Sequence, residues 1–361
     1  MGSKPIGISG SRAATILGLN DWQSEFELWQ RIMEERKLGF NFLQGYTMPE
    51  DPDNASIPWG SAFEDSIIML AEGKNVDNID YRECLFYYDL KIKEACQSNS
   101  KWKNKTRKNY ITCHIDGIYS KMSNQVTTLH EGKTTSQYQF RNEWGTPGTD
   151  KVPAYVQCQV QHQLLCTGAE KCIVSVLVFP KRPDEWEKEG WEIKQDTGNN
   201  EEKYRICDYK LNRKLMPDID PNSWAITLDQ MGYFHQYEIT ANRDLHKTMI
   251  KKYKTWWKKH IIKKQEPIPT KTDDIKRLFP EPIGTIVASE EMESLCNEYK
   301  QIGKEISNTG RLGKRRESLK VRILDWMRKQ DGTVDDDSRE KTILRDRSGK
   351  KLVSWNGKAF R

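Results

Sequence analysis

The sequence lacks any apolar run long enough to cross a membrane. A transmembrane helix needs about 20 consecutive apolar residues. Hydrophobic residues make up only 36% of this 361-residue chain, and charged residues, which make up 30%, interrupt them throughout. The first residues, Met1 to Lys4, also lack the apolar segment of a signal peptide. We therefore expect a soluble, intracellular protein that has no membrane partner.

Closely spaced cysteines are also absent. The chain has eight cysteines, but no two of them form a C-x-x-C pair. Zinc sites and iron–sulfur clusters usually draw their ligands from such pairs, so neither is expected here. Most of the cysteines lie in apolar or helical contexts, which indicates reduced thiols in a cytosolic protein.

A large net charge is lacking as well, because the formal charge is only +6. Two stretches nevertheless concentrate positive charge. Residues 101–108 place five basic residues beside Trp102, and Lys247 to Lys264 has helical spacing with an apolar stripe on one side and lysines elsewhere. Such stretches suit a phosphate backbone, and they equally suit a solvated loop or helix face.

Two short segments with strand-like alternation carry three ionisable residues. In Ile111–Tyr119 the apolar residues occupy alternate positions, which places Asp116 on the polar face. In Val126–Lys133, Glu131 and Lys133 are two residues apart and point the same way. A hairpin in the polar residues between the segments would set Asp116 opposite Glu131, with their Cβ atoms roughly 5 Å apart.

Two facing carboxylates repel each other unless they share a proton or bind a cation. Hard carboxylate oxygens favour Mg²⁺ or Mn²⁺, so the pair predicts a metal site. The alternative is that Glu131 and Lys133 form a solvated strand face and that Asp116 belongs to a turn. The spacing alone leaves both interpretations open.

A third acid precedes these segments. Ser61–Glu64 has the pattern of a capping box that opens a helix running to about Gly73. On that helix Glu64 shares a face with apolar residues, where an acid is costly without a partner. Glu64 therefore either caps its helix or joins the other acids.

A later helix adds two amides. Pro153–Thr167 predicts a helix that Gly168 ends, followed by the apolar strand Cys172–Phe179. Gln159 and Gln163 share one face of the helix. Amides in this position can hydrogen-bond to phosphate oxygens or to a metal-bound water, or they can be exposed.

Together these residues resemble the PD-(D/E)XK nuclease pattern, and specifically the YqaJ-type viral recombinases, the family of bacteriophage lambda exonuclease. Five landmarks follow one another in the family's order. They are the amino-terminal segments Ile8–Leu19 and Ser24–Trp29, the acid-bearing Gly60–Glu64, the segment His114–Gly117, the triplet Glu131-Gly132-Lys133, and the glutamine helix Tyr155–Gly168.

The resemblance implies an α/β fold, namely a PD-(D/E)XK (restriction-endonuclease-like) core with a central mixed β-sheet flanked by helices. The resemblance fails between residues 181 and 231, which predicts an insertion that either shapes DNA specificity or is decoration. We expect a nuclease domain over residues 1–270. A mostly helical appendage over residues 271–361, ending in a short β-hairpin, follows it.

The resemblance also implies roles for individual residues. The residues implied to hold Mg²⁺, with Mn²⁺ as a substitute, are Glu64, Asp116, Glu131 and the carbonyl group of Gly132. Lys133 is implied to position or activate the attacking water, and Gln159 to orient it. The residues implied to contact DNA are Lys4, Ser9, Ser11, Arg12 and Gln163.

Three positions depart from the family pattern. Ile115 replaces the proline before the aspartate, which removes no ligand. Gln163 stands where the family has a tyrosine that grips the strand. Lys4 stands where lambda-type enzymes bind the 5′-phosphate with arginine; a lysine can neutralise a phosphate, but it lacks the bidentate fork. The position of Arg12 does not make it equivalent to that arginine.

By resemblance, the expected activity is 5′-to-3′ digestion of double-stranded DNA ends in a bacterial or virus-infected cell. The product would serve a single-strand annealing protein, and the family implies a homotrimer. Two alternatives stay open. One is a site-specific or structure-specific endonuclease on the same core, which the unmatched insertion favours. The other is a non-catalytic DNA-binding scaffold, which the complete set of motif residues disfavours.

Overall fold

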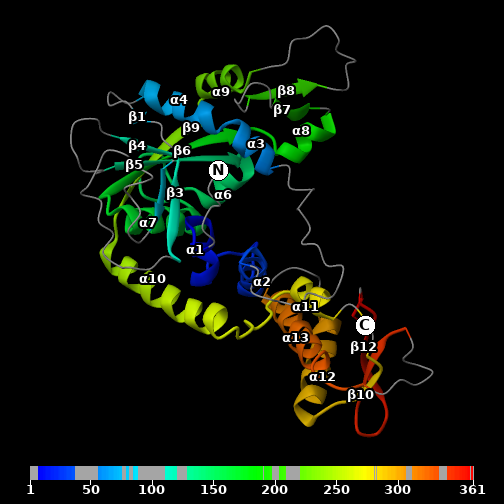
Figure 1. Cartoon of the computed structure of the whole chain (residues 1–361). Helices are drawn as coiled ribbons and strands as arrows, with labels where there is room; N and C mark the ends of the chain where they lie inside the picture. The colour runs from blue at the N-terminus through cyan, green and yellow to red at the C-terminus, as the bar shows by residue number, and fades with distance from the viewer. Residues whose placement is uncertain are drawn as a thin grey trace. The chain divides into compact units, whose positions relative to one another are not determined.

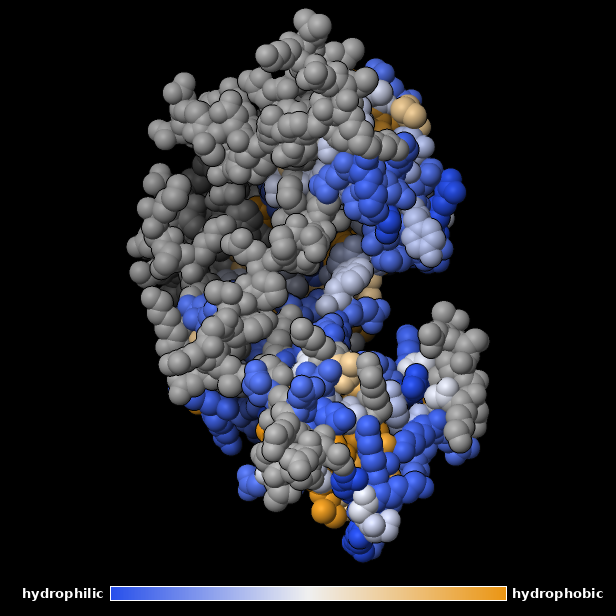
Figure 2. Space-filling view, turned by 90° about the vertical axis from the view of Figure 1, so that its right-hand side faces the viewer, coloured by the Kyte–Doolittle hydropathy of each residue, from blue (hydrophilic) through white to orange (hydrophobic). Residues whose placement is uncertain are grey.

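The computed structural model describes residues 7–36, 56–74, 79–80, 84–87, 110–119, 128–189, 191–196, 203–208, 220–279, 281, 283–305, 311–332, 340–357 and 359–360. Within these ranges no helix is both long and apolar enough to span a bilayer. On the face that Figure 2 shows, the described surface is mainly hydrophilic, with hydrophobic residues at scattered points. The chain divides into two compact units, of which the first is Met1–Leu19 with Pro49–Thr255 and the second is Asn20–Met48 with Trp256–Arg361.

The first unit is built around a β-sheet with helices on both sides (Figure 1). Its helices are α1 (Gly10–Leu17), α3 (Ser56–Ala62), α4 (Glu64–Lys74), α6 (Gln137–Glu143), α7 (Ala154–Thr167), α8 (Pro183–Glu189), α9 (Pro221–Gln230) and α10 (Arg243–Trp256). Its strands are β1 (Ile79–Asp80), β2 (Cys84–Tyr87), β3 (Thr112–Ile115), β4 (Gly117–Tyr119), β5 (Thr128–Ser136), β6 (Lys171–Phe179), β7 (Trp191–Asp196), β8 (Lys203–Asp208) and β9 (Phe234–Thr240).

The main sheet is mixed and has the order β1-β4-β5-β6-β9. Strands β5 and β6 are parallel, whereas the other neighbouring strands are antiparallel. The α7 helix connects the parallel pair, as a parallel crossover requires. Strand β6 is almost wholly buried, which explains its nearly continuous run of valine and other apolar residues. The predicted fold class, an α/β core with a central mixed sheet flanked by helices, is confirmed.

Opposite faces of the sheet are covered by different helices. Helices α4 and α9 cover one face, where Leu177, Phe179 and Phe234 enter the same buried cluster as Ile67. Helix α7 lies on the other face (Figure 1), because its glutamines reach Glu131 of β5. Each strand therefore presents alternate residues to different helices.

The insertion predicted at residues 181–231 forms α8, the β7–β8 antiparallel pair and α9. Its tryptophans belong to the core rather than to a separate appendage. Trp186 lies with its ring centroid 4.7 Å from that of Trp59, and Trp224 packs edge-on against Trp59 at 5.8 Å. The insertion thereby supports α3 and α4, the helices that flank the first acid of the motif.

The hairpin predicted around Asp116 and Glu131 forms in the predicted register. Gly117 pairs with His130 and Tyr119 with Thr128, so the register leads back to Asp116 opposite Glu131. The predicted continuous strand Ile111–Tyr119 is wrong, however, because it breaks at Asp116. Strand β3 pairs with β2, while β4 pairs with β1 and β5, so the chain leaves one sheet and enters another at this residue.

The predicted capping box at Ser61 is also wrong. Ser61 lies inside α3, and a break at Phe63 separates α3 from α4. Glu64 is the first residue of α4 and is exposed rather than part of a buried stripe. An acid in a first turn complements the free amide groups of the helix start, so it needs no buried partner.

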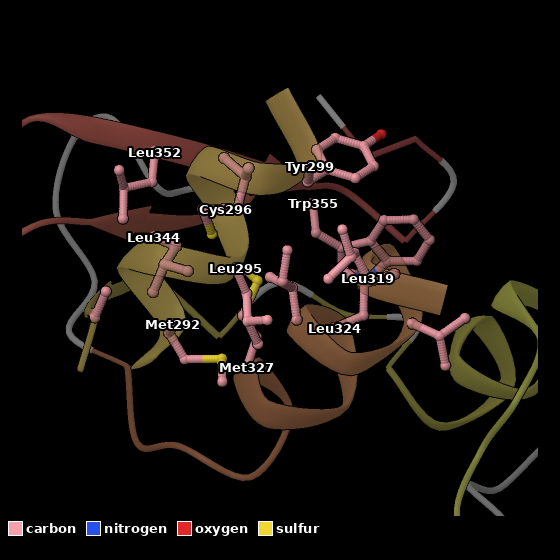
Figure 3. Packing of buried hydrophobic residues seen from close by; sticks show 14 of the residues in the cluster. Met292, Leu295, Cys296, Tyr299, Leu319, Leu324, Met327, Leu344, Leu352 and Trp355 are labelled. Carbon is pink, nitrogen blue, oxygen red and sulfur yellow. The ribbon is translucent and has the colours of Figure 1, made fainter. Parts of the chain in front are cut away.

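The second unit contains a helical layer packed on a small sheet. Its elements are α2 (Glu25–Glu35), the π-helix η2 (Trp257–Ile262), α11 (Thr272–Leu278), α12 (Glu290–Glu305), α13 (Arg311–Met327), β10 (Thr285–Val287), β11 (Thr342–Arg345) and β12 (Lys351–Trp355). Helices α12 and α13 and the sheet share one hydrophobic core, shown in Figure 3. The predicted C-terminal hairpin is confirmed by the antiparallel pair β11–β12.

Helix α2, which precedes Glu64 in the sequence, also belongs to the second unit. The Trp29 indole of α2 donates to the carbonyl oxygen of His260 at 2.9 Å, and the Ser24 hydroxyl donates to Asp274 at 2.7 Å. These buried contacts join segments more than two hundred residues apart in the sequence. The second compact unit therefore combines Asn20–Met48 with Trp256–Arg361, while the nuclease domain and appendage expected over residues 1–270 and 271–361 stay a prediction.

Trp355 anchors the core of the second unit. Its side chain is fully buried and its indole donates to the Phe279 carbonyl oxygen at 2.7 Å. We expect Trp355→Ala to lower the free energy of unfolding by about 3–5 kcal/mol, because a cavity forms and a hydrogen bond is lost. Urea unfolding of both proteins measures the change. The exposed Val287 is the control, and Val287→Ala should stay within about 0.5 kcal/mol of the unmodified protein. Equal effects of the two changes would contradict the assignment of this core.

Candidate active site

The centre of the candidate site is the carboxylate of Glu131, which is only 1% exposed. Lys133 Nζ and Gln159 Nε2 both donate to Glu131 Oε1. Gln163 Nε2 donates to Glu131 Oε2. A buried carboxylate is strongly destabilising unless hydrogen bonds and a counter-charge replace water. Here one ammonium group and two amides supply that replacement.

Two sequence periods bring these donors together. Glu131 and Lys133 are two residues apart on β5, so the strand sends both side chains to the same face. Gln159 and Gln163 are four residues apart on α7, which places them one turn above each other. Because α7 lies on the face of β5 that carries Glu131, each glutamine reaches one oxygen of the carboxylate.

A further residue on the same helix face was not predicted. Tyr155 precedes Gln159 by one turn of α7, and its phenol lies near the Lys133 ammonium. Burial raises the pKa of Tyr155, the Lys133 charge acts in the opposite direction, and Glu143 adds to the increase. The spacing of Tyr155, Gln159 and Gln163 at successive turns is the sequence signal that identifies it.

Asp116 lies at the break between β3 and β4, next to the triplet. Its Oδ2 atom accepts a hydrogen bond from the backbone N–H of Gly132 at 2.8 Å. Burial and the nearby charge of Glu131 raise the pKa of Asp116 well above its usual range; Glu64 adds to the increase, while Lys133 and the Gly132 N–H oppose it. The charges of Glu131 and Glu64 therefore both act on Asp116.

Gly132 allows Asp116 and α4 to approach the same point of β5. A Cβ atom at this position would lie 3.3 Å from Ile67 Cγ2 and 3.7 Å from Asp116 Oδ2. The first distance is tighter than ordinary van der Waals contact, so a side chain here would require Ile67 to shift by a few tenths of an ångström. Close packing against Ile67 thus explains why a glycine lies between Glu131 and Lys133.

Lys133 is positively charged in this environment. Burial alone would lower the pKa of its ammonium group, but the charges of Glu131 and Asp116 more than offset burial and raise the pKa above its usual value. The side chain as a whole keeps 21% of its surface exposed. The lysine is accordingly a fixed cation at the edge of the acidic cluster.

The donor chemistry suits a hard divalent cation. Burial raises the pKa of Asp116 most, and the nearby Glu131 charge adds to the increase; a bound cation relieves this repulsion between the acids. Across the described ranges, no three His, Cys, Asp or Glu side chains lie close enough together to hold a metal ion. Mg²⁺ commonly binds to one or two carboxylates, with waters and substrate phosphates completing its shell. Asp116, Glu131 and the Gly132 carbonyl fit that pattern, and Glu64 acts on Asp116 from farther away.

The amino-terminal motif lies beside the glutamine helix. Helix α1 approaches α7 so closely that a Cβ atom on Gly10 would lie 3.1 Å from Gln159 Cγ. Just before α1, the Ser9 hydroxyl shares a 3.0 Å hydrogen bond with the Ser11 hydroxyl. Arg12 donates to the Gly7 carbonyl oxygen at 2.8 Å. Of the residues expected to contact DNA, Lys4 lies outside the described residues.

Gln163 takes a different position from the one expected. It was predicted to contact DNA, but its side chain is 1% exposed and donates to Glu131. A residue buried behind a carboxylate has no surface to offer a strand. Where the family has a tyrosine, this chain therefore has a second amide that holds the central acid.

Fold and site together define an α/β protein whose central strand carries an E-x-K triplet beneath a glutamine-bearing helix. Residues 2–170 match the family model of the YqaJ-like viral recombinase domain. The match agrees with the resemblance that the motifs carry: residues 2–170 are similar to a YqaJ-like viral recombinase domain. Among curated proteins, none matches the chain.

Solved structures with related chain traces include two exonucleases. An alkaline exonuclease from Laribacter hongkongensis has a TM-score of 0.40 and 11% identity, over 70% of this chain and 87% of that one. A phage related exonuclease from Haemophilus somnus has a TM-score of 0.37 and 11% identity, over 72% of this chain and 96% of that one. These TM-scores and identities say nothing about the site. The roles of its residues are inferred from their geometry in this protein.

His130 lies on the sheet face opposite Glu131. Because it is buried, its protonation provides a way to measure how well this region excludes water. It is fully buried, and its Nε2 atom shares a 2.9 Å hydrogen bond with the Ser175 hydroxyl. Burial lowers the pKa of His130 to about 3, and the Lys133 charge acts in the same direction. In unfolded chains the imidazole has a pKa of about 6.5. Below that value the unfolded state binds a proton that the folded state excludes, so stability falls as the pH drops.

We expect a pH change from about 7 to about 5 to cost about 2 kcal/mol of unfolding free energy through His130. Urea unfolding at both pH values, for the unmodified protein and for His130→Gln, measures this contribution. The variant should lose about that much of the pH dependence. An unchanged pH dependence would show that His130 is protonated or solvated in the folded protein.

Proposed function

We propose that this protein is a metal-dependent deoxyribonuclease that digests double-stranded DNA from its ends in the 5′-to-3′ direction. The observation that carries the proposal is the buried Glu131 carboxylate, held by Lys133 and two glutamines beside the raised-pKa carboxyl of Asp116. The YqaJ-like viral recombinase domain over residues 2–170 supports the nuclease assignment. The direction of digestion and the preference for ends rest on the family resemblance.

Lys133 would act at the scissile phosphate as a cation. Because its pKa is raised, it carries a full positive charge at neutral pH and does not accept a proton from water in the resting site. Its three N–H donors can orient the attacking water and stabilise the charge that develops on the phosphate oxygens. Tyr155, which lies near the ammonium, limits where that group can move.

Asp116, Glu131 and the Gly132 carbonyl would hold Mg²⁺, with Glu64 nearby and Mn²⁺ as a substitute. When bound, the metal supplies Lewis-acid stabilisation of in-line attack at phosphorus. Gln159 and Gln163 keep the Glu131 oxygens in fixed directions, as outer hydrogen-bond partners of metal ligands do. Before any metal binds, the positive charge of Lys133 partly compensates Glu131 and Asp116.

The wider role follows from the product. Digestion of one strand from each 5′ end leaves a 3′ overhang, which is the substrate of a single-strand annealing protein in phage-type recombination. The family resemblance also implies a homotrimer. An endonuclease would use the same catalytic residues, so the experiment below is designed to distinguish it from an exonuclease.

The test compares linear and covalently closed circular duplexes with Mg²⁺ and with EDTA. We expect the linear duplex to be degraded only with Mg²⁺, with a label on the 5′ end released first, and the circle to be spared. Lys133→Ala should slow degradation by at least about 10²-fold, because the charge beside the phosphate is lost. The exposed Lys151 provides the control, and Lys151→Ala should keep the original rate.

Cutting of circles would replace the exonuclease by an endonuclease. A protein that binds DNA but cuts nothing with either Mg²⁺ or Mn²⁺ would be a scaffold. Full activity in Lys133→Ala, with an unchanged circular dichroism spectrum, would remove Lys133 from the mechanism.

A second prediction concerns Gln163. Gln163→Leu removes one amide donor from Glu131 but leaves Lys133 and Gln159 in place, so we expect kcat to fall about 10-fold to 100-fold and the half-saturating Mg²⁺ concentration to rise. Binding of DNA in EDTA should not change, because the side chain is buried. Gln157→Leu on the same helix is the matched control. If Gln163→Leu instead weakens DNA binding and leaves kcat unchanged, Gln163 contacts the strand.

A further inference from the structure

One helix of the first unit carries a concentrated basic face that the proposed catalysis does not use. Between residues 245 and 265 the chain has eight lysines and no acidic residue. These lysines exceed the formal charge of the whole protein, +6, so the rest of the chain is net acidic. Helix α10 carries the first half of this stretch, and η2 begins where α10 ends.

The opposite face of α10 is fixed on the glutamine helix. His246, Met249 and Tyr253 are buried. The Tyr253 hydroxyl shares a 3.0 Å hydrogen bond with His162 Nδ1, and His246 Nε2 shares one of 2.9 Å with Gln161 Oε1. Both partners belong to α7, beside the glutamines that hold Glu131. The buried face of α10 therefore packs on α7, and this packing fixes the orientation of the lysine face relative to α7.

Within the described residues, three of the four lysines of α10 have no carboxylate partner. Lys247 pairs with Asp244 at 2.9 Å. Lys251, Lys252 and Lys254 are exposed, and in the part of the chain that the structure describes none of them pairs with a carboxylate. Unpaired lysines that lie within a few residues of one another repel, and a bound polyanion relieves that repulsion.

Two arginines of another basic helix are paired with acids. On α13, Arg315 pairs with Glu298 at 2.8 Å and Arg322 with Glu291 at 3.4 Å. Each of these two arginines is thus paired with an acid of α12, whereas Lys251, Lys252 and Lys254 of α10 are not paired with an acid within the described residues. This difference distinguishes the α10 face from an ordinary solvated surface.

We propose that the outer face of α10, defined by Lys251, Lys252 and Lys254, binds the phosphate backbone of duplex DNA and so guides the substrate of the proposed nuclease. The identity of the polyanion rests on the proposed function. Lys251 and Lys254, three positions apart, are about 4.5 Å apart along the helix, and each strand of duplex DNA presents one phosphate per ~3.4 Å of the duplex axis. A helix laid along a strand can therefore offer each lysine a phosphate. The contact is independent of base sequence, because lysine presents only a point charge.

An anionic membrane is a poorer fit for the same lysines. A helix that binds a bilayer surface inserts an apolar face between the lipids. The apolar face of α10 is already buried, with Met249 and Tyr253 at 0% exposure. The exposed surface of α10 therefore matches a partner that binds through charge without an apolar contact, such as a nucleic acid backbone.

The experiment measures binding of a fluorescein-labelled duplex by anisotropy in EDTA, at several salt concentrations, so no cleavage is needed. The variant is K251Q/K252Q/K254Q. The control is K300Q/K350Q/K351Q, which removes the same charge from exposed positions of the second unit. Each lost phosphate contact should reduce the slope of log affinity against log salt by about 0.9, so the variant should lose about 2–3 units of slope and the control less than about one.

Several outcomes would overturn the proposal. They are equal salt slopes for the variant and the control, absence of duplex binding by the unmodified protein, and binding to phosphatidylserine vesicles that the variant loses while its DNA binding stays intact. Failure of the proposed nuclease looks different. In that case the unmodified protein binds the duplex with the predicted slope but does not degrade it when Mg²⁺ is added.

Discussion

The buried carboxylate of Glu131 is the constraint on which the rest of the site depends. Removing a carboxylate from water costs several kcal/mol unless its oxygens are fully compensated. Here compensation requires the ammonium of Lys133 from the same strand and two amides from α7. A shift of α7 by one residue along β5 would take both amides away from the carboxylate and leave only Lys133 to compensate it. The electrostatics of one side chain therefore fix the register between β5 and α7.

Other parts of the first unit converge on that contact. Gly10 brings α1 against Gln159, and Gly132 lets Asp116 and α4 meet the strand at one point. Insertion tryptophans such as Trp186 complete the core beneath α3 and α4. On the far side of α7, Tyr253 and His246 attach α10, whose outer lysines form the proposed DNA-binding face. The catalytic proposal and the backbone-binding proposal thus share one structural element, the glutamine helix.

Local sequence rules predict the parts of this arrangement that depend on local periodicity. The period of two places Glu131 with Lys133, helical spacing places Gln159 with Gln163, and Gly168 ends α7 as predicted. The hairpin register, which sets Gly117 opposite His130, also follows from the pattern. The breaks at Phe63 and Asp116 do not, because each depends on which distant element the chain packs against next. Burial of Gln163 likewise depends on where α7 meets β5, and a single helix pattern does not contain that information.

A crystal structure of the protein with Mn²⁺ and a short duplex tests the central claim most directly, because anomalous scattering locates the metal independently of activity. The account predicts a Mn²⁺ peak bound by Asp116, Glu131 and the Gly132 carbonyl, with Gln159 and Gln163 still in contact with Glu131. A Mn²⁺ peak elsewhere would contradict the account. So would a DNA complex in which Lys133 pairs with Glu131 and no metal lies beside that carboxylate.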